Sequence, residues 1–382
     1  MHQSRACAAW FAAWAMLFGA FAPGARADDD LTLANLNILH GLGCAPDLCR
    51  VPDRIDLLFD WIADAGCPDV VTLQEVNDLP AQAHQSRALI EAELATACGG
   101  QYDGNSVYSD VQDIDEEMLL SRYPILSSEV LVLHSGLAPN FTRHVLYAEI
   151  DHPAGAMDVF TTHLSSGSDQ ATNPCSPCPA ACTAAGATTN RECQAVQLAD
   201  YVNLKNDTAT PAFVTGDLNA EPGSFEYEHL VAQGWSDTHL AVGNAECDPL
   251  TTGAAGCTSG RESGDPSELE STADNVDRRI DYAFLVRASP SSSLCVRLDG
   301  AGDLDGDGTA TRVFADVSNP FAACGASPSA ICWPSDHEGN EVDANLGCAV
   351  VPTSPLAGYA LLAGLLLAFA VALTRRGLLR SS

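Results

Sequence analysis

Side chains suited to phosphate chemistry occur in short polar segments, each beside an apolar run of strand length. Acids and amides stand at Asn37, Glu75, Asp217 and Asn219. Oxygen donors of this kind suit Mg²⁺, which retains several of its waters when bound. Hydrolysis of a phosphate ester needs an aligned hydroxide and neutralisation of the equatorial oxygens, and a metal on such ligands assists both. These residues therefore predict metal-dependent hydrolysis of a phosphate ester.

Two histidines and an arginine extend this set. His163 ends one apolar run, His337 follows Ser335 and Asp336, and Arg143 opens a further run. Imidazole exchanges protons near neutral pH, and guanidinium is a strong phosphate donor. Taken singly, each residue has a plainer explanation, because acids and amides at strand ends often serve as caps and a lone histidine is often a structural donor. The combination is what indicates an active site.

The elements expected to position these residues are short strands and amphipathic helices. Apolar runs predict strands at 31–37, 69–73, 118–120, 129–133, 145–150, 158–162, 212–215 and 282–286. Helical spacing predicts helices at 54–65, 88–97, 193–202 and 224–233. The Gly-, Ser- and Thr-rich segments 165–190 and 244–277 are expected to be surface insertions held by cysteines.

In their order and spacing, these segments resemble the endonuclease/exonuclease/phosphatase superfamily from about residue 31 to 346. The most specific pieces are Gly-Asp-Leu-Asn at 216–219 and Ser-Asp-His at 335–337. Gln-Glu at 74–75, Arg-Ile-Asp-Tyr at 279–282 and Leu-Ser-Arg-Tyr-Pro-Ile at 120–125 support them. The resemblance implies an α/β (α+β) fold, a four-layer sandwich of two packed mixed β-sheets flanked by helices. The site is then expected where the strand tips of both sheets converge.

The resemblance also implies roles for nine residues. The ligands of Mg²⁺ or Mn²⁺ would be Glu75, Asn37 and Asp336. The attacking water would be oriented and deprotonated by Asp217, and the phosphate would be held by Asn219. A His–Asp dyad would be formed by His337 and Asp281, with His163 and Arg143 as donors to the phosphate.

Composition narrows the substrate. Without its two ends, the chain carries 50 acids against 13 bases, a net charge of −37, and its only lysine is Lys205. Such a surface repels nucleic acid. We therefore lean towards lipid head-group or small diesters, as in neutral sphingomyelinases, and the pair Arg191 and Gln194 after His163 is similar to that branch. An extracellular endonuclease and a catalytically inactive surface binding module are the alternatives. Trp333 is the clear candidate for contact with a bilayer.

Both ends of the chain have the composition of targeting segments. Residues 1–27 read as a signal peptide, and 28–350 as the single catalytic domain. Residues 351–382 read as a hydrophobic anchor or sorting tag that ends in Arg375, Arg376 and Arg380. We expect an exported monomer, anchored at the cell surface through this helix or secreted after its removal.

Cysteine usage agrees with export. Outside residues 1–27 there are 14 cysteines, an even number that suits full pairing in an oxidising compartment. Short loops could be closed by Cys44 and Cys49, Cys247 and Cys257, and Cys324 and Cys332. The run Cys175, Cys178 and Cys182 fits a metal knot or disulfides, and the export signal favours disulfides.

One acidic run has the spacing of a calcium loop. Asp303, Asp305 and Asp307 alternate before Gly308, but Phe314 stands where a bidentate Glu is expected. A Ca²⁺ site and a solvated acidic turn are both compatible with this run.

Overall fold

The structure is a computed structural model of the chain. It describes residues 30–40, 50–78, 85–111, 115–135, 142–167, 171–206, 210–250, 256–261, 266–271, 275–286, 297–298 and 331–346. The chain divides into two compact units, Met1–Gly347 and Cys348–Ser382, and every described residue belongs to the first. The expected signal peptide, the C-terminal anchor and the calcium run at Asp303, Asp305 and Asp307 lie outside the described residues. Among the helices that the structure describes, none has the length and apolar character to cross a membrane.

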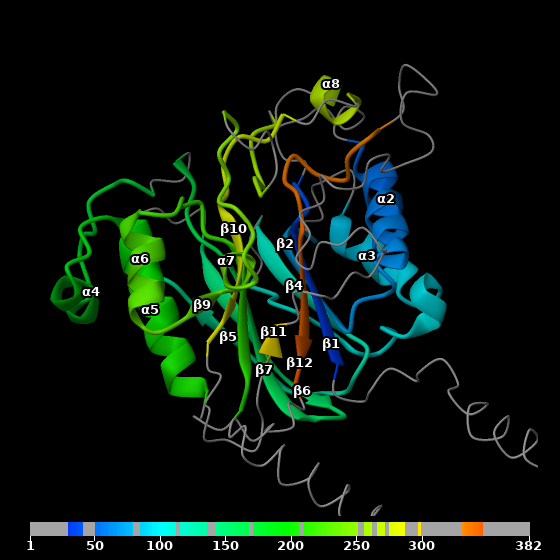
Figure 1. Cartoon of the computed structure of the whole chain (residues 1–382), viewed down its shortest axis with the longest axis horizontal. Coiled ribbons are helices and arrows are strands. Elements are labelled where there is room, and N and C mark those ends of the chain that lie inside the picture. The colour runs from blue at the N-terminus through cyan, green and yellow to red at the C-terminus, as the bar shows by residue number, and fades with distance from the viewer. Residues whose placement is uncertain are drawn as a thin grey trace, which may run out of the picture. The chain divides into compact units, whose positions relative to one another are not determined.

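Two six-stranded mixed sheets form the centre of the molecule (Figure 1). The first has the order β11 (Arg297–Leu298), β12 (Asn340–Asn345), β1 (Asp30–Asn37), β2 (Val70–Val76), β4 (Glu116–Ser121), β3 (Ser106–Tyr108). The second has the order β5 (Ile125–Val132), β6 (His144–His152), β7 (Gly155–His163), β8 (Ala212–Asp217), β10 (Asp281–Leu285), β9 (Ser236–Asp237). Each sheet has one parallel pair, β1 with β2 and β7 with β8.

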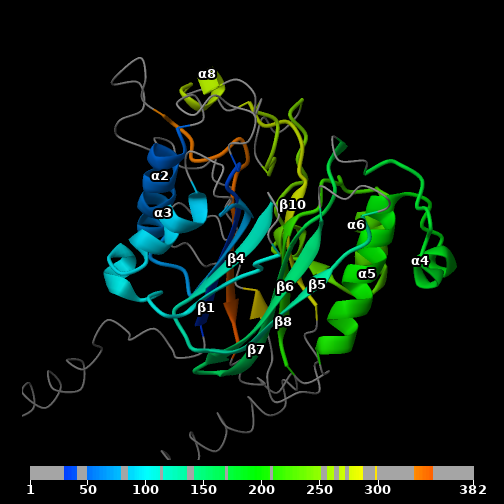
Figure 2. The same ribbon diagram turned by 180° about the vertical axis from the view of Figure 1, so that it is seen from behind.

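Helices cover the outer face of each sheet, as Figures 1 and 2 show from opposite sides. The first sheet is covered by α2 (Val51–Asp64), α3 (Ser86–Glu93) and the 3₁₀ turn η1 (Ala97–Gly100). The second is covered by α5 (Asn190–Lys205) and α6 (Phe225–Ala232). Shorter helices are α4 (Ala180–Ala185), α7 (Thr238–Ala241) and α8 (Pro266–Leu269). A capping box of Thr189 and Glu192 begins α5 by satisfying backbone N–H groups of its first turn.

Three apolar layers hold the sandwich together. Leu36, Ile62 and Leu73 belong to the layer between the first sheet and its helices. A second layer lies between the other sheet and its helices. The third layer, which contains Leu33, Leu119, Leu146 and Phe213 among other residues, joins strands of both sheets. Strands buried on both faces read as continuous apolar runs, which explains why the sequence predicted them. The expected four-layer sandwich is confirmed.

One expectation about the loops needs correction. Part of the 244–277 segment is buried: Cys257 and Thr258 are fully enclosed, and Ser259 bridges to Arg278 and to His337. This stretch therefore packs into the domain and is no surface insertion, because its small polar side chains bond to the start of β10. The described part of the other segment, 165–190, is mostly exposed, contains the short helix α4 and is held by two disulfides, as expected for a surface insertion.

Candidate active site

The parallel strand pairs bring polar side chains to one edge of the sandwich. Asn37 ends β1 opposite Gln74 of β2, and His163 ends β7 opposite Asp217, the last residue of β8. Carboxyl ends of adjacent parallel strands lie at the same edge, so these residues meet at the tips of both sheets. These polar side chains thus lie at the strand tips of both sheets, where the resemblance implied the site.

Two backbone features aim these side chains. Glu75 has a φ of 61° and lies in the register shift between Leu73 and Val76, a bulge that re-aims its carboxylate. Gly216 has a φ of 138°, and a Cβ there would stand 1.9 Å from the Thr162 carbonyl oxygen. Only glycine permits this approach of β8 to β7, which sets Asp217 beside the end of β7.

The predicted dyad of His337 and Asp281 is formed. His337 Nδ1 lies 2.9 Å from Asp281 Oδ2, and the Thr258 hydroxyl accepts the Asp281 N–H at 3.1 Å. Burial raises the pKa of Asp281 to about 6. Burial opposes protonation of His337, but the carboxylates of Asp281 and Asp336 outweigh it and raise its pKa well above the usual value. The pair therefore retains a proton near neutral pH.

A second histidine–carboxylate pair was not predicted from the sequence. His163 Nδ1 lies 2.9 Å from Asp115 Oδ1, and Arg143 donates to Asp115 Oδ2. Burial alone would raise the pKa of Asp115, yet Arg143 and His163 hold it well below its usual range. Burial and Arg143 lower the pKa of His163, but Asp115 and Asp217 prevail and raise it to about 9. Arg143 thus reaches the site through Asp115.

Asp217 lies between the two pairs. Its Oδ2 is 3.3 Å from His163 Nε2 and 3.8 Å from His337 Nε2, while its Oδ1 accepts the Asn219 N–H at 2.7 Å. The Asn219 side-chain amide contacts His163 Nε2 at 2.8 Å. Both imidazoles therefore present their second nitrogen to one carboxylate oxygen.

Glu75 and Asn37 complete the centre of the site. Asn37 Nδ2 donates to Glu75 Oε1 at 2.9 Å and to Asp217 Oδ2 at 3.1 Å, and its oxygen accepts the Leu39 N–H at 3.1 Å. Ligation of a metal through the Asn37 oxygen would require a half-turn of the amide. Burial and the neighbouring Glu75 raise the pKa of Asp336, which shows that these two carboxylates repel each other.

The donor set fits a divalent cation. Ligand atoms of Glu75, Asp115 and His163 lie within 4.8 Å of one another. So do those of Asp217, Asp281 and His337. Buried carboxylates held this close repel one another unless a cation neutralises them. Acidic and histidine side chains of the site could therefore hold a divalent cation, and of the three predicted ligands Glu75 belongs to one of these groups.

Comparison with known proteins supports this description. The model of the Endonuclease/Exonuclease/phosphatase family matches residues 34–337. The chain belongs to the endonuclease/exonuclease/phosphatase family. Members of this family are phosphoester hydrolases, usually metal-dependent. The matched range runs from the middle of β1 to His337 and so includes both histidine pairs.

Solved structures of the family share the fold. A humanized TDP2 of D. rerio is 17% identical, with a TM-score of 0.55, covering 83% of this chain and 99% of that one. A Bacteroides vulgatus family protein is 18% identical, with a TM-score of 0.52 and coverages of 83% and 99%. One from Leptotrichia buccalis is 16% identical, with a TM-score of 0.52 and coverages of 83% and 100%. No curated protein matches the sequence significantly.

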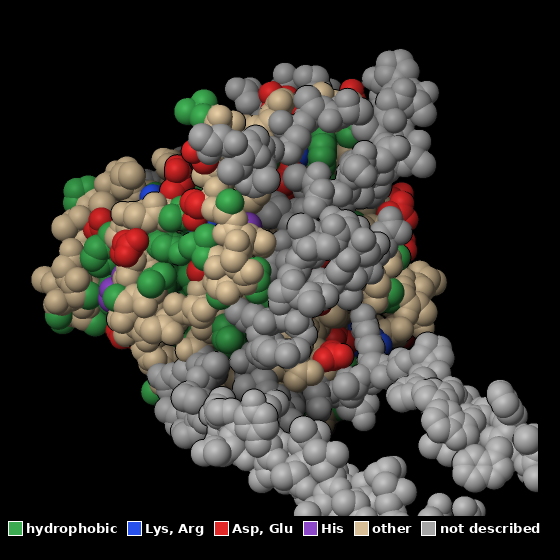
Figure 3. Space-filling view, viewed as in Figure 1, with side chains coloured by type: hydrophobic (Ala, Val, Ile, Leu, Met, Phe, Trp, Pro, Cys, Tyr) green, Lys and Arg blue, Asp and Glu red, His purple; other side chains and the backbone are tan. Residues whose placement is uncertain are grey.

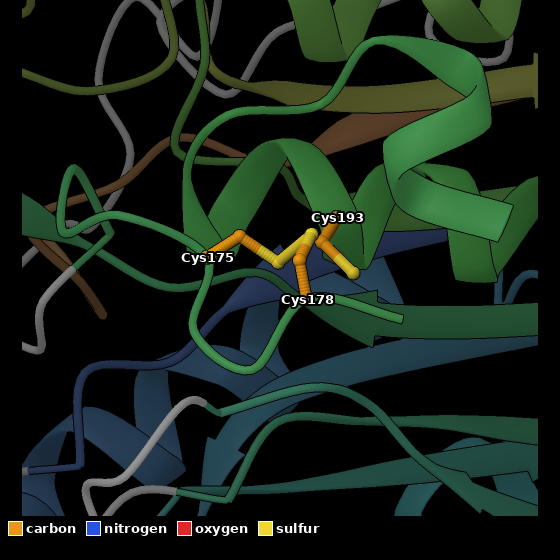
Figure 4. A group of neighbouring side chains, drawn as sticks. All are labelled: Cys175, Cys178 and Cys193. Atoms are coloured by element: carbon orange, nitrogen blue, oxygen red, sulfur yellow. A yellow bond between two sulfur atoms is a disulfide. The ribbon is translucent and has the colours of Figure 1, made fainter. Parts of the chain in front are cut away.

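The cysteine run is paired as disulfides. Cys175 bonds Cys178, and Figure 4 shows this pair beside Cys193. Cys193, near the beginning of α5, bonds Cys182. Further disulfides are Cys67–Cys98, which the sequence did not indicate, and Cys247–Cys257, which it did. Sulfur atoms of Cys175, Cys178 and Cys193 lie within 4.8 Å of one another. Since these sulfurs are bonded in disulfides, the pairing favours the disulfide interpretation over the metal knot.

Proposed function

We propose that this chain is a metal-dependent phosphodiesterase. The observation that carries the proposal is the convergence of both histidine pairs on Asp217 Oδ2, with Nε2 atoms at 3.3 and 3.8 Å. Two protonated imidazoles beside one carboxylate suit an in-line displacement, in which the carboxylate activates water and the imidazoles donate to the phosphate and to the departing oxygen.

The residues divide this work as follows. Asp217 orients the attacking water and takes its proton, and His337, which Asp281 helps to keep protonated, donates a proton from Nε2 to the departing oxygen. His163, whose pKa is raised to about 9, remains protonated at neutral pH and donates to the phosphate. The side-chain amide of Asn219, which lies beside His163 Nε2, donates to a phosphoryl oxygen. A divalent ion held by Glu75, with Asp336 nearby, would neutralise charge on the phosphate.

For the substrate, charge favours small diesters over nucleic acid. On the face in Figure 3, acidic side chains are scattered over the described surface while basic side chains show only in small spots. Eight of the described basic side chains lie in ion pairs, whereas Arg278 is exposed; the eight are Arg50, Arg87, Arg122, Arg143, Arg191, Lys205, Arg261 and Arg279. Paired bases release few counterions from a polyanion, so they add little affinity for DNA.

Two features expected to support a lipid substrate have structural roles. Trp333 is only 4% exposed, donates from its indole nitrogen to the Ser271 carbonyl, and lies under the Arg261 guanidinium. It is therefore buried and cannot dip into a bilayer. Arg191 pairs with Glu226. Gln194 bonds the backbone and hydroxyl of Ser165 and so fixes the segment after His163. We accordingly place small diesters before lipid head groups.

The second candidate is a nuclease. D. rerio TDP2, which shares the fold at 17% identity, has been solved with a single-strand DNA product. An inactive binding module is less well supported, because binding alone needs no pair of histidine–carboxylate dyads around one acid. Turnover of bis(p-nitrophenyl) phosphate, sphingomyelin vesicles and plasmid DNA at matched metal and salt decides among these. Rapid plasmid nicking without turnover of the small diester would make the protein a nuclease, and no turnover of any of the three would favour the binding module.

We also propose export and a monomeric state. Four disulfides among the described residues support an oxidising compartment. Mass spectrometry of the protein from its native host is expected to find an N-terminus near residue 28, and will show whether residues 351–382 are retained as an anchor. Light scattering of the purified domain is expected to give the mass of one chain; a dimer would contradict the monomer.

A further inference from the structure

His40 is built into the metal edge of the site, although no role was assigned to it above. Arg54 donates to the carbonyls of Ile38 and Leu39, at 2.6 and 2.9 Å, from a fully buried position. Leu39 adopts a φ of 55°, which turns the chain sharply before His40. Asn77 then donates to the His40 carbonyl at 3.1 Å. The backbone from Ile38 to His40 is therefore fixed.

His40 contacts Glu75 through both its backbone N–H and its imidazole. The His40 N–H donates to Glu75 Oε2 at 2.8 Å, and His40 Nε2 lies 3.4 Å from the same oxygen. Glu75 Oε1 is occupied by the Asn37 amide. The His40 side chain is 24% exposed and that of Glu75 is 12% exposed, so their contact lies at the solvent side of the cluster.

This spacing is that of two ligands on one ion. Ligands about 2.1 Å from a metal and at right angles to each other lie about 3 Å apart. An ion at the Glu75 edge therefore has an imidazole nitrogen within reach.

We infer that His40 is a nitrogen ligand of the ion held by Glu75 and shifts the preference of this site from Mg²⁺ towards Mn²⁺. Mg²⁺ takes oxygen ligands almost exclusively, whereas imidazole binds first-row transition ions more strongly. The inference rests on the proposed metal-dependent function and deepens it. A histidine that merely neutralised Glu75 would raise or lower the affinities for both ions together.

Direct metal binding tests the inference. The dissociation constants of Mn²⁺ and Mg²⁺ are measured by titration calorimetry on the full disulfide-bonded domain and on the variants His40→Ala, His40→Gln, Glu75→Gln and His229→Ala. His229 stacks on Phe225 of α6 and serves as the matched control. We expect wild type and His229→Ala to prefer Mn²⁺, and both His40 variants to lose about tenfold of that preference. Glu75→Gln should bind both ions weakly.

Electron spin-echo spectroscopy of the Mn²⁺ form supplies an independent readout, because a coordinated imidazole gives ¹⁴N modulation. We expect the modulation to weaken in His40→Ala, and His40→Gln covers the case in which His40→Ala fails to fold. An unchanged Mn²⁺/Mg²⁺ ratio and unchanged ¹⁴N modulation in the His40 variants would overturn the role of His40 and leave the enzyme proposal standing. Failure of the wild-type protein to bind either ion would overturn the metal-dependent function itself.

Discussion

The two histidine–carboxylate pairs have the same 2.9 Å spacing but different surroundings. Asp115 is bonded by Arg143 as well as by His163, whereas Asp281 is bonded by His337 and packs against the Thr258 hydroxyl. The guanidinium keeps Asp115 ionised, while burial raises the pKa of Asp281 to about 6. Arg143, a permanent cation, therefore fixes the charge of the pair formed by His163 and Asp115. Among the contacts of Asp281 described here there is no arginine, so the pair formed by His337 and Asp281 can exchange its proton.

The largest expected effect tests this division. His337→Ala should lower kcat/KM on bis(p-nitrophenyl) phosphate by about three to four orders of magnitude, the upper range for a general acid–base group. Asp281→Asn should cost about two orders, because the imidazole remains but loses its orienting carboxylate. Both variants should melt near the wild-type temperature. Loss of the melting transition would show that the pair is structural.

The second prediction separates the pairs by stability. Asp115→Asn should lower the free energy of unfolding by about 3–5 kcal/mol, since it leaves the buried Arg143 without its carboxylate. The matched Asp281→Asn change should cost clearly less. Urea denaturation measures both, and Glu129→Gln, which breaks the exposed pair with Lys205, is the control at below about 1 kcal/mol. Equal losses at Asp115 and Asp281 would contradict the difference in surroundings.

The third prediction concerns pH. His163 has a pKa of about 9 in the folded chain against 6.5 as its ordinary value, so the folded state holds a proton that the unfolded state releases. The bound proton of His163 adds about 3 kcal/mol to the free energy of unfolding. This contribution is fully present below pH 6.5 and is lost as the pH rises through 9. Metal-free protein should therefore unfold at lower urea at pH 9 than at pH 6, and His163→Asn should remove most of that difference. A pH dependence that is the same in the variant would refute the fixed-charge role.

The smallest effect comes from two disulfides of similar span. Cys182–Cys193 leads into Gln194, which fixes Ser165 near His163, and Cys247–Cys257 precedes Thr258, which bonds Asp281. Replacing either pair by serines should cost about 2–3 kcal/mol of stability, because loops of this length have similar closure entropies. Only the second change should also lower kcat, by up to about tenfold. A kcat loss confined to the first variant would reverse the comparison.

Much of the fold could be predicted from the sequence because strands buried on both faces are continuous apolar runs.

The residues of the site were predicted less completely. Asp217, His163 and His337 stood out since each follows such a run or a specific motif. Asp115 did not, because it begins three consecutive acids and only the packing of β4 against β7 selects it from Glu116 and Glu117. Three buried acids at the start of an apolar strand were the available signal, since unpaired acids are rarely buried.

Thr258 was hidden for a different reason. Its neighbours are Gly, Ser and Thr residues, whose composition indicates a surface loop, and its burial depends on bonds to β10 and to Glu338. Small polar side chains carry no periodic pattern that would reveal such a position. Contacts between segments distant in sequence therefore decided the parts of the site that composition and spacing left out.

The arrangement of the pairs has a consequence for biosynthesis. Each pair takes one partner from each sheet: His163 from β7 with Asp115 before β4, and Asp281 from β10 with His337 before β12. β12 joins the sheet beside β1, so among the described strands the last to leave the ribosome pairs with the first. A nascent chain lacks His337 until that moment. On the proposed mechanism, a nascent chain and a product terminated before His337 are both expected to lack hydrolytic activity.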